Sequence, residues 1–163
     1  MAGTPIRSRA LPPALGMYSH GMVAPAGELV IVAGQVGADA AGQLVGPGDA
    51  AAQTRQTFEN VRAVLEAAGC AMADVVRFQT FLTHAADIDA FMGARKALFA
   101  RYYPDGAYPP NTLLIVSRLV QPDLLVEIEA MAVRRARPTA AARGRARPAA
   151  RRKAASAKAR RRR

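Results

Sequence analysis

The chain has 163 residues and a formal net charge of +11, but residues 134–163 hold 14 of its 23 Lys and Arg residues and none of its 12 acidic ones. Residues 1–133 therefore form a slightly acidic unit, long enough for one domain with a single core. The only cysteine, Cys70, excludes an intrachain disulfide or a thiolate metal cluster, and the two histidines have no cysteine partners, so we expect no zinc site.

The first 16 residues contain charges and prolines but lack the apolar stretch of a signal peptide. No apolar run approaches the roughly 18 residues that cross a bilayer. We therefore expect a cytoplasmic protein that makes no membrane contact.

The first strong secondary-structure signals are a strand and a helix. Residues 28–37 form a β-branched run closed by glycines, which predicts a buried strand. After a glycine-rich loop, Asp49 stands where a helix N-cap is expected. Apolar residues then recur at helical spacing from Phe58 to Leu65, and Gly69 supplies a C-terminal stop.

A second strand and helix follow, and then two more strands. Residues 74–83 alternate in the manner of a strand, and Asp87 is expected to cap a helix that ends before Pro104. Residues 112–116 and 124–133 are the last two expected strands. Residues 18–23 are expected to belong to an additional N-terminal hairpin.

This order predicts an α+β fold in which two helices cover one face of a mixed sheet. The other face is left bare, and the last expected strand has apolar residues on both sides, so we expect that face to pack on another subunit. We assign residues 1–13 to a flexible N-terminus and 14–133 to the domain. Residues 134–163 contain no side chain that could anchor a core and are expected to be a disordered cationic tail.

Four motifs resemble one known family in the same order. They are MYSHG at 17–21, VAGQVG at 32–37, AAQTRQTFENVRAVLEAAG at 51–69 and VEIEAMAVRR at 126–135. The chain resembles the RidA family, also called the YjgF or L-PSP endoribonuclease family. The resemblance implies a chorismate-mutase-like fold and a homotrimer whose three sheets make a central barrel. It also implies clefts between subunits where reactive 2-imino or 2-enamino acids are hydrolysed without a cofactor.

The resemblance also implies site residues. The family's tyrosine falls on Tyr18, its Gly-Gln pair on Gly34 and Gln35, and its water-positioning glutamate on Glu127. The sequence departs from the family pattern at two positions. Ala33 stands where a serine commonly precedes the Gly-Gln pair. In the turn that carries the family's carboxylate-binding arginine, Asn111 takes the place of that arginine and is followed by Thr112.

The missing arginine bears on the substrate. A guanidinium holds a carboxylate by two charge-assisted hydrogen bonds, each contributing roughly 1.5–3 kcal/mol. A neutral amide at Asn111 would forfeit at least ~3 kcal/mol, which is over 100-fold in affinity. Arg118 is expected to lie beyond the end of its strand and does not replace that arginine. We therefore expect a substrate other than an ordinary 2-imino acid.

Other interpretations of these residues remain open. Glu127 and Glu129 share one strand face and could be solvated or ion-paired at a subunit interface. Tyr18 could be a core or interface aromatic instead of a cleft hydroxyl. The cleft could also bind a small metabolite without catalysis.

The tail gives a third hypothesis, non-specific nucleic-acid binding, since dense positive charge attracts polyanions. Its candidate residues are Arg143, Arg145, Arg147, Arg151, Arg152, Lys153, Arg160, Arg161, Arg162 and Arg163. The alternative for the tail is a solvated extension without a partner.

Overall fold

The computed structural model describes residues 3–135, and the expected cationic tail beyond Arg135 lies outside the described residues. Two strands, β1 (Thr4–Ile6) and β2 (Gly21–Val23), form an antiparallel hairpin. The main sheet has the strand order β3-β6-β4-β5. Its strands are β3 (Glu28–Val36), β4 (Val75–Leu82), β5 (Asn111–Ile115) and β6 (Val126–Arg134).

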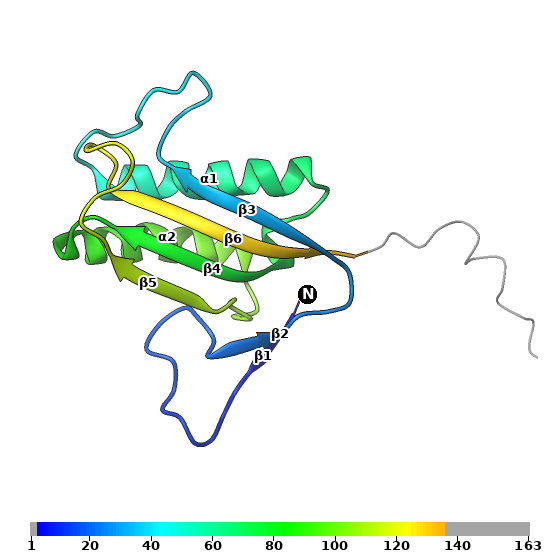
Figure 1. Cartoon of the computed structure of the whole chain (residues 1–163). Coiled ribbons are helices and arrows are strands. Elements are labelled where there is room, and N and C mark those ends of the chain that lie inside the picture. The colour runs from blue at the N-terminus through cyan, green and yellow to red at the C-terminus, as the bar shows by residue number, and fades with distance from the viewer. Residues whose placement is uncertain (1–2, 136–163) are drawn as a thin grey trace, which may run out of the picture.

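Two α-helices, α1 (Ala50–Ala67) and α2 (Ile88–Tyr102), and two short 3-10 helices, η1 (Met72–Asp74) and η2 (Ala85–Asp87), complete the fold. Strand β6 runs antiparallel to both of its neighbours, and β4 and β5 are parallel and joined through α2. Both helices lie behind the sheet in Figure 1, which confirms the predicted α+β architecture. Within residues 3–135, no helix has the length and hydrophobicity to span a membrane.

Helix α1 begins and ends as its sequence predicts. The Asp49 carboxylate accepts a hydrogen bond from the Ala52 amide at 2.9 Å, so it satisfies one of the free N–H groups of the first turn. Gly69 follows the helix with a φ of +75°, a conformation that other residues adopt only with strain.

Helix α2 begins differently from the prediction. Asp87 precedes it, but its side chain makes no capping hydrogen bond. The residue is instead the last of η2, and its helical backbone, at φ −86° and ψ −3°, does not give the extended geometry of a capping residue.

The core lies between the sheet and the two helices. Phe58 of α1, Phe78 of β4 and Phe99 of α2 pack together with ring centroids 5.5–5.9 Å apart. On β6 the buried positions alternate with half-buried ones, as expected for a strand with one face on the core. The buried residues of β6 on that face are Val126, Ile128, Ala130 and Ala132.

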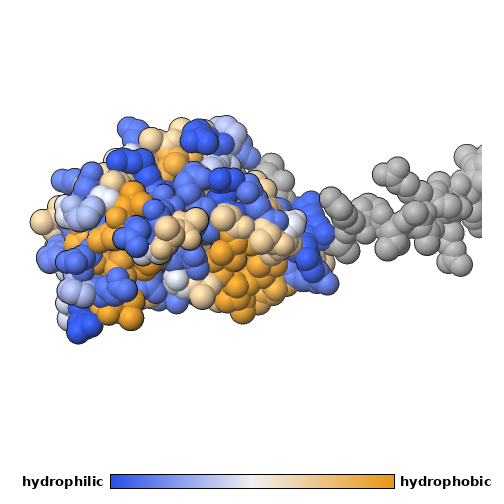
Figure 2. Space-filling model, turned by 90° about the horizontal axis from the view of Figure 1, so that it is seen from above, coloured by the Kyte–Doolittle hydropathy of each residue, from blue (hydrophilic) through white to orange (hydrophobic). Residues whose placement is uncertain are grey.

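The opposite face of the sheet is uncovered in the single chain. Leu29 and Ile31 of β3 are 60% and 67% exposed there. Figure 2 views the molecule from above and not onto this face, and the surface that it shows carries apolar patches separated by polar side chains. Strand alternation places Arg77, Gln79 and the two glutamates of β6 on the same face, so this face is mixed in character and not purely apolar.

Two boundaries differ from those expected. Strand β1 lies inside residues 1–13, which were expected to be flexible, because it pairs with β2. Strand β6 extends one residue beyond the expected end of the domain. Arg134 forms an ion pair with Glu28 at 2.7 Å and donates a hydrogen bond to the Ala68 carbonyl, and these contacts extend the strand.

Candidate functional site

The candidate site centres on an irregularity in β3. Val32 pairs with Ala130 and Gln35 pairs with Ile128, so Ala33 and Gly34 together face the single residue between those partners, Glu129. This is a β-bulge, a feature that redirects side chains and is frequent beside active sites.

Gly34 allows the Glu127 side chain to lie directly against the backbone of the bulge. A Cβ added at Gly34 would overlap the Glu127 carboxylate, and its nearest neighbours are all atoms of that side chain. The structure therefore brings together Gly34 and Glu127, two of the site residues that the family resemblance implied. Glycine is needed here for close approach, without a positive φ.

The electrostatic surroundings of Glu127 favour its protonated form. Burial raises the pKa of Glu127 first, and the nearby negative charge of Glu129 raises it further. A half-buried carboxyl with a raised pKa takes up a proton more readily than an ordinary surface glutamate, which suits it to exchange a proton with a bound water or substrate.

Gln35 stabilises the bulge from within β3. Its side-chain amide donates to the Ala33 carbonyl at 3.2 Å and, with a longer contact of 3.4 Å, to the Gly34 carbonyl. Both contacts use the side-chain NH₂ group of Gln35, which is therefore engaged within its own strand.

Asn111 and Thr112 start β5, away from the bulge. Asn111 pairs with Phe78 in the parallel register, and its side-chain oxygen accepts a hydrogen bond from the buried Thr80 hydroxyl at 3.0 Å. It therefore lies on the helix-facing side of the sheet. Glu127 pairs with Phe81 and lies on the opposite side. A single chain does not bring Asn111 and Glu127 together.

Arg118 does not take the place of an arginine at position 111. Strand β5 ends at Ile115, and Arg118 donates to the Leu119 and Val120 carbonyls in the following loop. The expectation that it lies beyond the strand is confirmed.

Tyr18 lines a different cavity of the single chain. This cavity has a volume of about 450 Å³ and lies under the loop between β1 and β2, where Tyr18 meets His20 edge-to-face at 6.2 Å. Tyr108 contributes to its wall, whereas Glu127 does not. Within one chain, Tyr18 and the bulge are thus separate features.

Arg95 is a buried residue that sequence reasoning missed. Its side chain is 2% exposed, packs against the rings of Phe91 and Phe99, and donates to the Met17 carbonyl at 2.9 Å. Its Nε has no partner among residues 3–135. The signal was available, since Arg95 falls between Phe91 and Leu98 on the apolar stripe of α2.

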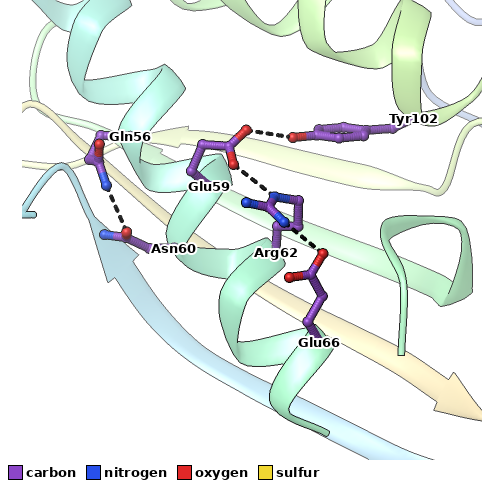
Figure 3. Close-up of polar contacts among 6 residues, drawn as sticks. All are labelled: Gln56, Glu59, Asn60, Arg62, Glu66 and Tyr102. Atoms are coloured by element: carbon purple, nitrogen blue, oxygen red, sulfur yellow. Dashed lines mark hydrogen bonds and ion pairs between the residues drawn. The ribbon is translucent and has the colours of Figure 1, made fainter. Parts of the chain in front are cut away.

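A second cluster of ionisable groups lies on the exposed side of α1 (Figure 3). Glu59 accepts hydrogen bonds from Arg62 and from the Tyr102 hydroxyl at 2.7 and 3.0 Å, and Arg62 also pairs with Glu66 at 2.6 Å. Burial alone would raise the pKa of Glu59, but the hydrogen bonds from Arg62 and Tyr102 outweigh it and lower that pKa. The cluster links the two helices, and its charges are already paired.

Potential metal ligands do not cluster in the described part of the chain. Residues 3–135 contain no group of three or more His, Cys, Asp or Glu side chains placed to hold an ion. Cys70 is buried, and burial raises the pKa of its thiol, so it is a packing residue rather than a nucleophile.

Comparison with known proteins places this chain in a protein family. Residues 8–134 match the family model described as Endoribonuclease L-PSP. A 2-iminobutanoate/2-iminopropanoate deaminase of Escherichia coli K12 is 35% identical over 124 residues, a match that covers 76% of this chain and 92% of that protein.

Solved structures agree with this match. A protein of the conserved Rid family from Yersinia pestis superimposes with a TM-score of 0.72 at 34% identity, covering 82% of this chain and 99% of that one. The E. coli protein TdcF, solved with bound serine, gives a TM-score of 0.60 at 31% identity, covering 80% and 98% of the two chains.

Proposed function

Because this chain belongs to the Endoribonuclease L-PSP family, which is the RidA family, we propose that it is a hydrolase that deaminates a reactive imine or enamine. Water adds to the imine carbon, the carbon–nitrogen bond breaks, and a carbonyl compound and ammonia leave. The observation that carries this proposal is the Glu127 carboxyl seated on the Gly34 bulge.

Glu127 has the properties that this reaction needs. As a carboxylate it accepts a proton from the attacking water, and as an acid it returns that proton to the departing nitrogen. Its raised pKa makes proton uptake easier than for an ordinary surface glutamate. The bulge at Ala33 and Gly34 presents backbone groups beside it, and Tyr18 of a neighbouring subunit would complete the cleft.

The substrate we propose is not an ordinary 2-imino acid. The E. coli relative is named for 2-imino acids, and TdcF is described with serine, so the ligands of both carry a carboxylate. Asn111 offers that group no positive charge, and its side-chain oxygen is already bonded to Thr80. Arg118 is likewise engaged by its own loop.

The test is ammonia release from 2-aminoacrylate, compared between the natural chain and an Asn111→Arg variant. We expect little turnover from the natural chain and a gain of activity in the variant. Turnover by the natural chain at the rate of the E. coli deaminase, assayed alongside, would contradict the argument from Asn111. Tight binding of a metabolite without turnover of any imine or enamine would favour the non-catalytic binding function.

The proposed assembly is a homotrimer in which the uncovered sheet face packs on other subunits. Support comes from the exposed Leu29 and Ile31 on that face. Burying apolar surface of this kind contributes about 25 cal/mol per Å². In the proposed trimer, β5 of one chain would lie near the bulge of another and bring Thr112 toward Glu127, since strand alternation points Thr112 to the uncovered face.

A second candidate function comes from the charge division in the sequence. The 14 cationic residues of 134–163 favour non-specific association with nucleic acid, whereas residues 1–133 carry a small negative charge. Apart from Arg134 and Arg135, these cations lie outside the described residues, so this candidate rests on composition alone.

A further inference from the structure

The segment that carries Tyr18 has few contacts of its own to hold it in place. Residues 7–20 connect β1 to β2 and contain no helix or strand. Apart from one contact from Arg95, the hydrogen bonds of these residues within the described chain join residues no more than three apart. The side chain of Met17 packs against the core. The position of Tyr18 therefore depends on what holds Met17.

Arg95 holds the backbone of Met17 from the middle of α2. Its Nη2 donates to the Met17 carbonyl at 2.9 Å, across 78 residues of sequence. Its guanidinium carbon lies 5.6 Å from the ring centroid of Phe91 and 5.0 Å from that of Phe99, so two aromatic rings fix the direction from which it donates. Because the Met17 carbonyl lies in the same peptide plane as the amide of Tyr18, this contact also fixes where the Tyr18 side chain leaves the backbone.

The surroundings of Arg95 are unfavourable for its charge. The residue is 2% exposed, forms no ion pair within residues 3–135, and its Nε has no hydrogen-bond partner there. Desolvation lowers the pKa of this arginine. A buried charge without a partner costs free energy, and an apolar side chain of similar volume in its place is often neutral or stabilising. The hydrogen bond to Met17 is the contribution that an apolar side chain could not make.

We propose that Arg95 is a positioning residue, which holds the backbone at Met17 so that the Tyr18 hydroxyl lies in the cleft of the neighbouring subunit. The inference rests on the proposed function, because that function is what gives Tyr18 a role. Arg95 is buried and acts through the Met17 carbonyl, so it is not itself a catalytic residue.

The first test is amide hydrogen exchange on the full chain, which needs no substrate. Arg95→Met removes the donor and the charge but keeps a long apolar side chain. Exchange in residues 17–20 is expected to become about tenfold faster, the scale of one hydrogen bond to a charged group, while the free energy of unfolding does not fall. Arg101→Met is the matched control, because this exposed arginine of the same helix lies over the Tyr102 ring, and it should leave that exchange unchanged.

The second test asks whether the effect passes through Tyr18. Ammonia release from 2-aminoacrylate is measured in the full chain carrying Asn111→Arg, the variant expected to gain this activity. In that background Arg95→Met is expected to lower kcat about 10- to 100-fold, the scale of a small displacement of a catalytic group. When Tyr18→Phe is already present, the same change is expected to cost about twofold at most, because the two residues act as a unit. A general loss of folding would lower kcat equally in both backgrounds.

Unchanged exchange of residues 17–20 in Arg95→Met would overturn the proposal, and so would equal losses of kcat with and without the Tyr18 hydroxyl. If no variant released ammonia, the proposed deamination would fail, while the exchange result would still decide whether Arg95 holds this segment. Should Arg95→Met not fold, Arg95→Lys carries the same comparisons, because lysine keeps the charge and the stem but lacks the planar group that packs on the rings.

Discussion

At the scale of single residues, Glu127 is the side chain on which the proposed chemistry depends. Glu127→Gln keeps the shape but cannot take up or release a proton, so the rate of ammonia release should fall about 10²- to 10⁴-fold, the usual contribution of general acid–base catalysis. KM should change little. Glu129→Gln serves as the control and should keep most of the activity, since Glu129 lies across from the bulge and is not the group seated on Gly34.

The pH dependence of activity should reveal the influence of Glu129 on Glu127. Burial and the Glu129 charge raise the pKa of Glu127 above its ordinary value of 4.5, and the ionised form is needed to activate water. Activity should therefore fall as the pH drops through that raised pKa. Removing the neighbouring charge in Glu129→Gln should lower the pKa of Glu127 and move the acidic limb of the pH–rate profile to lower pH. An acidic limb that stays in place would contradict the coupling.

Gly34→Ala tests the close approach of Glu127 to the bulge. The added methyl group would displace a flexible side chain and leave the backbone in place, so activity should fall strongly while the free energy of unfolding changes little. The control is Gly93→Ala on the exposed side of α2, where an added Cβ meets no atom within 4 Å. That change should stabilise the protein by up to about 1 kcal/mol through helix propensity.

The identity of the candidate site residues could be predicted more fully than their arrangement. The resemblance of short motifs pointed to Gly34 and Glu127, but the bulge that brings them together depends on strand register, which periodicity does not determine. Arg95 was missed because one charged residue on an apolar stripe is usually read as solvent-facing. Its burial depends on Met17, which is 78 residues away in the sequence.

At the scale of elements, the two helix starts provide a matched pair of substitutions. Asp49→Ala removes a side chain that caps α1, and it should lower the free energy of unfolding by about 1 kcal/mol. Asp87 precedes α2, and its side chain makes no capping hydrogen bond. Asp87→Ala should therefore lower the free energy of unfolding by clearly less than Asp49→Ala. Urea denaturation followed by circular dichroism measures both. Equal losses would show that the hydrogen bond of Asp49 is not the source of its effect.

Each expected helix and strand of the main sheet is present, with ends displaced by at most two residues, because each has a strong apolar period or a turn residue at its boundary. The additional N-terminal hairpin is confirmed, but the position of its first strand, β1, was not predicted. It has only three residues and contains Pro5, so it carries no periodic signal, and it forms because β2 is available to pair with it. The additional residue of β6 likewise depends on Glu28, a partner distant in sequence.

At the scale of the whole molecule, light scattering on residues 1–135 should give three times the monomer mass, with little dependence on salt because exposed aliphatic side chains drive the contact. Ile31→Glu should shift the population toward monomer, since it places a charge on the uncovered sheet face. Leu15→Glu is the control, because Leu15 is equally apolar and lies in the loop before β2. A monomer in the unsubstituted chain would contradict the proposed assembly.

The cationic segment should act independently of the domain. The full chain should bind duplex and single-stranded nucleic acid without sequence preference, and truncation after Arg135 should abolish binding. The logarithm of affinity should fall linearly with the logarithm of salt concentration, with a slope of about −0.9 per phosphate neutralised on duplex DNA. Gel-shift titrations at several salt concentrations measure this. Binding by the truncated domain would instead indicate a basic surface on residues 1–135.

The position of β6 has a consequence for how the protein is made. This strand lies between β3 and β4, yet it is the last to be synthesised, and its pairing joins Glu28 to Arg134 across 106 residues of chain. Until it emerges from the ribosome, β3 and β4 each expose an unpaired edge and the helices have an incomplete sheet to cover. Pairing over such separations makes folding slow and leaves the nascent chain open to aggregation. The residues before β6 therefore cannot complete the sheet until this last strand has been synthesised, and until then they need protection from aggregation.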